Sequence, residues 1–243
     1  MSSRRLSVAS LVRLAMTAVP LLLFTACKFG APPGATREGQ SISRLYQLLF
    51  YAAIPIGVIV YGLMVWVIVR YRRKSDRLPK QFRYHIPLEV LYTLIPVLLV
   101  TGLFVATYHT ERKIDRLQAN PDLRLNVTAF QWQWRFSYPD LGVKVIGRPG
   151  APPNMVLPAG KLVRIRLVAT DVDHSFFVPA FLFKRDAIPG FPNRFDFEVD
   201  RPGTYFGECA EFCGLDHADM TFRIKAMSPA GFQRWISQQE ATA

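Results

Sequence analysis

The sequence predicts a membrane-anchored protein of mixed fold, in which a two-helix transmembrane hairpin at residues 43–109 precedes an all-β sandwich domain at residues 110–243. Two long apolar runs flank a short basic loop, and short alternating runs replace them after residue 122. Charge divides the chain at the same place: residues 1–109 hold 13 Lys and Arg against three acids, whereas residues 110–243 hold 17 against 15. Positive charge between apolar runs indicates a membrane. Because no basic patch with interleaved aromatic residues is found, we exclude nucleic-acid binding.

Residues 1–26 have the features of a signal peptide. Three arginines accompany the apolar run at residues 14–24, which is too short to span a bilayer. The tetrapeptide Phe24-Thr25-Ala26-Cys27 resembles a bacterial lipobox, whose cysteine is lipidated, although that pattern prefers Leu at the first position. We therefore predict lipidation of Cys27; the alternative is an ordinary signal peptide with a chance cysteine. Residues 27–42 are predicted to form a linker, since most of this segment is polar and rich in Gly and Pro.

Residues 45–69 and 86–108 are the two predicted membrane spans. The first run has 25 residues and no acid, so as a helix it extends roughly 37 Å, enough to cross the hydrocarbon core. The loop at residues 70–83 carries seven basic residues and one acid, which places it in the cytoplasm. Both ends of the hairpin, and therefore residues 110–243, are then predicted on the outer side of the membrane.

Residues from Leu123 onward have the character of a β-domain. Alternating runs of β-branched and aromatic residues follow one another at short spacing, with turn signals such as Arg201-Pro202-Gly203 between them. This pattern predicts a β-sandwich or barrel. Residues 228–239 are predicted to form a terminal helix, capped by Ser228, whose apolar face is made by Phe232, Trp235 and Ile236.

The stretch GECAEFCGLDHADM, residues 207–220, concentrates metal-binding side chains. Its spacing is C-x3-C-x3-H-x2-M, given by Cys209, Cys213, His217 and Met220. Two thiols, an imidazole and a thioether favour copper over zinc, because zinc has little use for a thioether. A Cys209–Cys213 disulfide would leave His217 and Met220 unexplained, and a single blue-copper site would need only one cysteine. Two thiolates in a short loop can instead bridge two copper ions, which then require a second histidine.

His174 is the best candidate for that second histidine. It lies 35 residues before Cys209, and we expect it at the end of a strand over residues 161–170, which a sandwich can bring beside the cysteine loop. The other two histidines, His85 and His109, border the apolar runs and are interpreted as membrane-interface residues.

Three motifs together resemble subunit II of haem-copper cytochrome c oxidases: DVDHSFFVP, LFKRDAIPG and the cysteine stretch, in that order. The resemblance covers roughly residues 43–237 and implies a cupredoxin-like β-domain on the outer face of a bacterial cytoplasmic membrane. It also implies a dinuclear copper centre, CuA, bridged by the thiolates of Cys209 and Cys213. His174 and His217 would each bind one copper ion. Met220 would bind one of them weakly, and the backbone carbonyl of Glu211 would bind the other.

The same resemblance assigns a role to one tryptophan of Gln131-Trp132-Gln133-Trp134. Trp132 would receive electrons from the donor, although Ala129 and Phe130 replace the Gly-His that usually precedes this stretch in the family. The alternative is that both tryptophans belong to the core of the sandwich.

Three carboxylates also acquire roles from the resemblance. Glu211 would lend its carboxylate to a magnesium ion shared with subunit I, and Asp186 would support that polar interface. Glu89 would mark the entrance of a proton path into subunit I, with Tyr92 in place of the family's Trp. For Glu89 the alternative is a side chain that snorkels to the membrane surface.

A respiratory function follows from this resemblance. The chain would accept electrons from cytochrome c, either soluble or membrane-tethered, and pass them to the haems of subunit I, where O2 is reduced to water with proton pumping. The expected partners are oxidase subunits I and III and membrane lipid. Four acids are predicted to orient the donor: Asp200, Glu208, Asp216 and Asp219.

Three other functions explain less of the sequence. Subunit II of quinol oxidases shares the hairpin and sandwich but lacks the copper ligands. A membrane-anchored copper chaperone or thiol–disulfide protein would leave the second span, Met220 and the tryptophan pair unexplained. Nitrous oxide reductase has a similar ligand loop but needs a large propeller domain, for which 243 residues leave no room.

Overall fold

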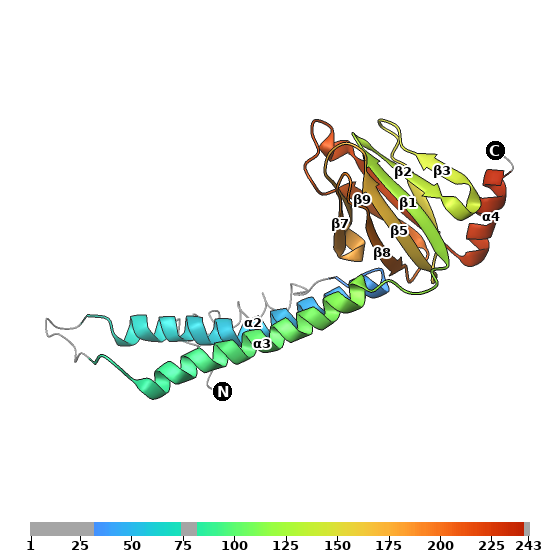
Figure 1. The fold of residues 1–243 in the computed structure, drawn as a ribbon. Coiled ribbons are helices and arrows are strands. Elements are labelled where there is room, and N and C mark those ends of the chain that lie inside the picture. The colour runs from blue at the N-terminus through green and yellow to red at the C-terminus, as the bar shows by residue number, and fades with distance from the viewer. Residues whose placement is uncertain (1–31, 74–81, 241–243) are drawn as a thin grey trace, which may run out of the picture. The chain divides into compact units, whose positions relative to one another are not determined.

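The computed structural model describes residues 32–73 and 82–240 (Figure 1). The predicted signal peptide, the lipidation candidate Cys27 and most of the basic loop lie outside the described residues.

Two antiparallel helices, α2 (Arg37–Arg70) and α3 (Ile86–Asp115), form the hairpin and run side by side (Figure 1). Within the described residues, both are long and apolar enough to cross a membrane, and their most apolar windows are not buried by protein. The two helices therefore fit a membrane anchor, because lipid can cover the apolar side chains that the protein leaves exposed.

Both helices begin at identifiable caps. The Thr36 hydroxyl accepts a hydrogen bond from the Gly39 amide at 2.9 Å and starts α2. At α3, the His85 ring accepts from the Leu88 amide at 3.3 Å while the Glu89 carboxylate accepts from the His85 amide at 3.1 Å. This reciprocal pair resembles a capping box, with an imidazole in place of the usual hydroxyl.

The helices are longer than the predicted spans. Helix α2 already begins at Arg37, so the last third of the predicted linker is helical, because Thr36 supplies the cap. Helix α3 continues beyond residue 109 to Asp115, into the segment assigned to the outer domain. Its last turns contain Glu, Arg and Lys, which are good helix formers and do not stop a helix when the apolar run ends.

After α3, the described residues include ten β-strands in two five-stranded sheets (Figure 1). The first sheet has the order β3 (Val143–Ile146), β2 (Gln133–Tyr138), β1 (Leu123–Phe130), β5 (Leu162–Ala169) and β8 (Asn193–Glu198). The second has the order β4 (Asn154–Pro158), β10 (Thr221–Met227), β9 (Gly203–Cys209), β6 (His174–Val178) and β7 (Phe183–Ala187). The pairs β1–β5 and β4–β10 are parallel and all other neighbours are antiparallel. The predicted sandwich is thereby confirmed.

Aromatic side chains fill the space between the sheets. Trp134, Phe136, Phe176 and Phe222 are fully buried, and the rings of Phe176 and Phe222 stack at 4.7 Å. Burial of each such side chain stabilises the fold by about 1.5–3 kcal/mol. The core therefore supplies a rigid support for the loops at its ends.

The predicted terminal helix is confirmed as α4 (Pro229–Glu240). The Ser228 hydroxyl accepts from the Gly231 amide at 3.2 Å, as expected of a cap. Phe232 is buried, and Trp235 packs against Tyr138 with ring centroids 5.3 Å apart.

Gly207 leaves no room for a side chain at the centre of the core. It pairs with Phe222 across strands β9 and β10, and a Cβ there would lie 2.3 Å from the Phe222 ring. We expect Gly207→Ala to lower the free energy of unfolding by about 1–3 kcal/mol, because the buried ring must shift. Denaturant unfolding would measure this loss. Gly203→Ala, in the same strand, is the control: its Cβ would meet nothing closer than 3.4 Å, so an equal loss in both variants would contradict the packing argument.

Candidate metal centre

Two neighbouring strands and one loop bring the metal-binding candidates together. Strand β6 begins at His174 and pairs with β9, which ends at Cys209; Phe176 faces Cys209 in the register. The loop from β9 to β10 carries Cys213, His217 and Met220, and the Cys209 amide donates to the Met220 carbonyl at 3.0 Å. The ends of the loop are thus held together by the sheet.

The strand prediction for His174 was wrong in one respect. The residue does not end the strand over residues 161–170 but starts the next strand, β6, in the opposite sheet. The Asp-rich loop after β5 crosses between the sheets, and this crossing places His174 directly beside Cys209.

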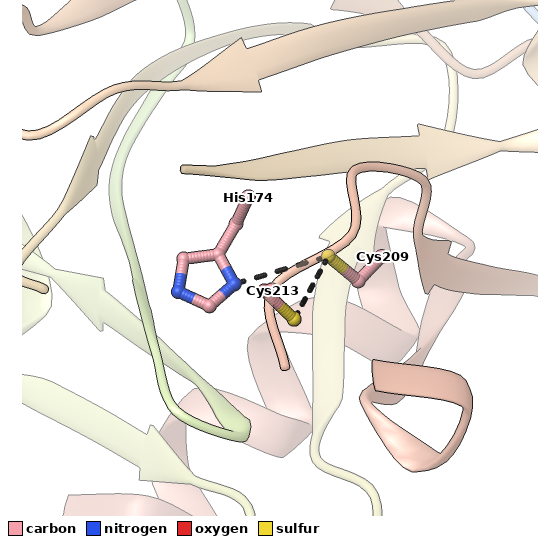
Figure 2. A group of neighbouring side chains, drawn as sticks. All are labelled: His174, Cys209 and Cys213. Atoms are coloured by element: carbon pink, nitrogen blue, oxygen red, sulfur yellow. Dashed lines mark hydrogen bonds between the residues drawn. The ribbon is translucent and has the colours of Figure 1, made fainter. Parts of the chain in front are cut away.

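The centre of the site is a buried group made by His174, Cys209 and Cys213 (Figure 2). The two sulfur atoms are 3.8 Å apart, and the His174 Nδ1 is 3.8 Å from the Cys209 sulfur. His174 is 0% exposed, and the cysteines are 6% and 4% exposed. A disulfide has sulfur atoms about 2.05 Å apart, so both cysteines are free thiols in this structure.

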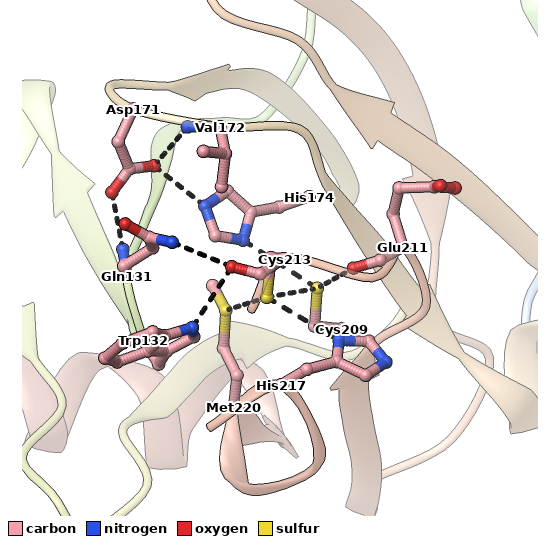
Figure 3. A network of polar contacts seen from close by, with 10 residues as sticks. All are labelled: Gln131, Trp132, Asp171, Val172, His174, Cys209, Glu211, Cys213, His217 and Met220. Atoms are coloured by element: carbon pink, nitrogen blue, oxygen red, sulfur yellow. Dashed lines mark hydrogen bonds and ion pairs between the residues drawn. The ribbon is translucent and has the colours of Figure 1, made fainter. Parts of the chain in front are cut away.

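Three further candidate ligands surround the sulfur pair (Figure 3). The His217 Nδ1 lies 3.6 Å and the Met220 sulfur 3.9 Å from the Cys213 sulfur. The backbone carbonyl of Glu211 lies 3.3 Å from the Cys209 sulfur. Figure 3 shows the two imidazoles on opposite sides of the sulfur pair. The structure therefore brings together all six predicted ligands, and this set of soft and borderline donors fits copper.

The two thiols differ in acidity in the metal-free chain. Burial raises the pKa of both, but hydrogen bonding from His174 and from backbone amides brings the pKa of Cys209 down to about 6. Burial and the neighbouring Cys209 raise the pKa of Cys213 to about 12. At neutral pH the pair then carries one thiolate, and binding of a metal by both sulfurs must release the Cys213 proton.

This difference predicts two separate ionisation steps in the metal-free chain. The ultraviolet absorbance of thiolate should rise first near pH 6 for Cys209 and again near pH 12 for Cys213. Because the folded pKa of Cys209 lies below its ordinary value of 9.0, its own contribution to stability is complete above pH 9.0 and is lost as the pH falls through 6; the raised pKa of Cys213 has the opposite effect and lowers stability above pH 9.0. Cys209→Ser should remove the first step. Two thiols that both ionise near 9.0 would contradict the assignment.

The tryptophan pair divides into two environments. Trp134 is fully buried in the core, and its Nε1 donates to the Met220 carbonyl at 3.2 Å. Trp132 is half-buried in the β1–β2 turn, and its Nε1 donates to the Cys213 carbonyl at 3.2 Å. Trp132 packs against the edge of the core but is only partly buried, and it lies between the surface and the ligand loop.

Sequence reasoning assigned no role to three residues that position the ligand loop, Trp132 or His174. The Gln131 side chain donates to the Cys213 carbonyl at 2.8 Å, alongside Trp132. Gly214 has φ +119°, and a Cβ there would lie 3.2 Å from the Trp132 ring. Asp171 contacts the His174 Nε2 at 2.9 Å. In the sequence, Gln131 and Gly214 are marked only by lying next to Trp132 and Cys213. Asp171 is marked only by lying three residues before His174.

The predicted magnesium ligand, the Glu211 carboxylate, lies outside the copper-binding group. The Glu211 carboxylate is half-exposed, and the Lys184 ammonium lies 3.5 Å from it and 3.5 Å from the Asp186 carboxylate.

The four acids predicted to orient a donor do not form one cluster. Asp200 precedes β9, whereas Cys209 ends that strand, and a rise of about 3.3 Å per residue puts them at opposite ends. Asp200 was therefore assigned wrongly to the surroundings of the ligand loop. Asp216 and Asp219 do line a groove beside the metal group, together with Trp132.

Comparisons with known proteins agree with this geometry. The family model for the transmembrane domain of cytochrome c oxidase subunit II matches residues 25–109, and the model for its periplasmic domain matches residues 150–227. Probable cytochrome c oxidase subunit 2 of Streptomyces avermitilis is 36% identical, with 86% of this chain and 78% of that protein covered. Cytochrome c oxidase subunit 2 of Mycobacterium bovis is 29% identical, with 97% and 82% covered.

A solved structure is also similar. The periplasmic domain of cytochrome oxidase subunit II from Bradyrhizobium japonicum is 32% identical with a TM-score of 0.48, covering 52% of this chain and 99% of that domain. The family matches and the relatives show what the chain is. It belongs to the cytochrome c oxidase subunit II family, and so to an oxidoreductase complex, with a membrane anchor and a CuA-type outer domain.

Proposed function

We propose that this chain receives the electrons for a respiratory cytochrome c oxidase at a dinuclear copper centre, held by His174, Cys209, Glu211, Cys213, His217 and Met220. The observation that supports this most is the pair of buried sulfur atoms 3.8 Å apart, each with its own imidazole nitrogen within 3.8 Å. A single zinc ion could take the two thiolates and two imidazoles, but it would leave the Met220 thioether and the Glu211 carbonyl, which also contact the sulfur pair, without a role.

The protein contributes by positioning the copper ligands and by excluding water from them. When bound, the copper pair supplies the ability to accept and release one electron. The chain holds the sulfur atoms on the end of β9 and a loop closed by hydrogen bonds, and it buries both cysteines, His174 and Met220. Because these groups are fixed by the sheet, little rearrangement accompanies the change of charge.

Trp132 is the proposed point of arrival for the electron. Its indole reaches the surface on one side and donates to the Cys213 carbonyl on the other. Asp216 and Asp219 line the same groove as Trp132, and in this proposal they attract a cationic donor to that surface.

The proposal extends to the setting of the chain. The donor is a soluble or membrane-tethered cytochrome c, and electrons continue to the haems of subunit I, where O2 is reduced to water with proton pumping. Subunits I and III and lipid cover the exposed apolar faces of α2 and α3 in a bacterial cytoplasmic membrane. The Glu211 carboxylate shares a magnesium ion with subunit I, Asp186 supports that polar interface, and Cys27 carries the lipid.

Rapid mixing tests this function. Reduced soluble cytochrome c is mixed with the assembled oxidase at several ionic strengths, and the redox state of each centre is followed in time. We expect the copper absorbance to change before that of the haems, with a rate that falls as salt rises. A rate independent of salt indicates a tethered donor, and haem reduction that precedes any copper signal contradicts the proposal.

Glu89 allows a separate prediction about proton uptake. Glu89→Gln removes the charge but keeps an acceptor for the His85 amide, so the helix cap is retained. We expect oxygen turnover to fall about tenfold or more, a barrier increase above about 1.4 kcal/mol, while the first electron transfer from the donor is unchanged. Glu111→Gln, near the other end of α3, is the control. Wild-type turnover in Glu89→Gln would leave Glu89 only its capping role.

A further inference from the structure

Asp171 lies at the crossing between the two sheets and contacts both sides of the site (Figure 3). One carboxylate oxygen is 2.9 Å from the His174 Nε2 and also accepts from the Val172 amide at 2.8 Å. The other oxygen accepts from the Gln131 amide at 2.6 Å. One side chain therefore joins a candidate copper ligand to the turn that carries Trp132.

The contact between Asp171 and His174 determines which ring nitrogen of His174 faces the metal site. The Nδ1 faces the Cys209 sulfur at 3.8 Å, and the Nε2 faces Asp171. A carboxylate accepts hydrogen bonds but cannot donate them, so Asp171 holds a ring proton at Nε2; a metal would then bind at Nδ1, in place of the proton that Nδ1 donates to the Cys209 sulfur in the metal-free chain.

The contact with Gln131 decides where Trp132 lies. With its amide held by Asp171, Gln131 places its side chain on the Cys213 carbonyl at 2.8 Å, and the Trp132 Nε1 shares the same carbonyl at 3.2 Å. Gly214 permits this approach, since a Cβ would crowd the indole. The β1–β2 turn, which carries Trp132, is thus joined to the ligand loop at the Cys213 carbonyl.

We propose that Asp171 is a positioning residue that sets His174 and Trp132 together, so that copper retention and the arrival of electrons depend on the same carboxylate. This inference rests on the proposed function. A carboxylate offers about four acceptor positions, and three N–H groups already occupy Asp171. These three hydrogen bonds distinguish Asp171 from the acids of the groove; its charge is partly exposed, so any contribution to attracting a cationic donor has to be separated from positioning by salt.

Asn cannot replace this carboxylate. Its amide has one accepting oxygen and one donating nitrogen, so in either orientation a donor group faces the Gln131 amide or the His174 Nε2–H. Asp171→Asn should therefore lose the hydrogen bond to either the Gln131 amide or the His174 Nε2. Asp173→Asn is a matched control, because Asp173 is an exposed acid in the same loop and makes no hydrogen bond or ion pair with the described residues.

The test compares wild-type, Asp171→Asn and Asp173→Asn assembled oxidase. Each preparation is tested for the copper that it retains against a chelator and for its EPR spectrum. The KM for the donor and the electron-transfer rate at high salt are measured in the same preparations. For Asp171→Asn we expect copper affinity to be lower by about 10- to 100-fold, an altered copper spectrum, and slower electron transfer at high salt with an unchanged KM. Asp173→Asn should match wild type.

Two outcomes would overturn the inference. One is wild-type copper retention and spectrum in Asp171→Asn; the other is an effect confined to KM at low salt, which marks a docking acid. If Asp171→Asn does not assemble, Asp171→Glu decides: its carboxylate is displaced by one methylene, so weaker copper retention with unchanged KM supports positioning, and wild-type retention overturns it. A wild-type oxidase without copper in this subunit would refute the proposed function itself.

Discussion

Cys213→Ser should abolish the copper centre while leaving the sandwich folded. Cys213 is 4% exposed and lies 3.8, 3.6 and 3.9 Å from the Cys209 sulfur, the His217 Nδ1 and the Met220 sulfur, so it contacts three of the other candidate ligands. A serine hydroxyl has a far higher pKa than a thiol and cannot supply a bridging thiolate. We expect complete loss of electron transfer from the donor and of the paired copper signal.

The fold should survive this change because the substituted side chain is small. Circular dichroism and denaturant unfolding would report on the sandwich, and metal analysis on the centre. Met220→Leu is the control, since it keeps both thiolates and a similar volume; copper should remain bound with a shifted reduction potential. Electron transfer at the wild-type rate in Cys213→Ser would contradict the bridging role.

Trp132→Phe should slow the arrival of electrons without removing copper. The smaller ring loses the Nε1 hydrogen bond to the Cys213 carbonyl and no longer connects the surface to the ligand loop. We expect the transfer rate from the donor to fall by about tenfold or more, which corresponds to about 1.4 kcal/mol in the barrier. Stopped-flow reduction of the assembled oxidase measures this rate directly.

Trp235→Phe provides the matched control for an aromatic substitution. Trp235 lies on α4, and its ring packs against those of Tyr138 and Phe232. Its replacement should lower stability slightly and leave electron transfer unchanged. Equal rates in Trp132→Phe and wild type, with copper fully bound, would show that electrons arrive by another route.

Local chemistry made much of the site predictable from sequence. Cys209, Cys213, His217 and Met220 lie within twelve residues, so their proximity follows from the chain itself. The helical spans were equally visible, because lipid requires long apolar runs. The terminal helix was predictable because its cap and its apolar face are both local features.

Other features depend on how distant segments pack together, so the local sequence pattern did not predict them. The run from Leu123 to Tyr138 alternates throughout, yet it folds back at Gln131 and Trp132 into two paired strands. The β5–β6 loop carries His174 across to the other sheet, so its position depends on sheet order. Asp171 and Gln131 are joined only because that crossing meets the β1–β2 turn. Asp200 was misplaced because a strand separates residues that are near in sequence.

Copper content and the EPR spectrum of the oxidised, purified protein test the central claim most directly. The account predicts two copper ions bound by this chain, with a single unpaired electron shared equally between their nuclei. One blue copper ion, zinc, or a Cys209–Cys213 disulfide without metal would contradict it.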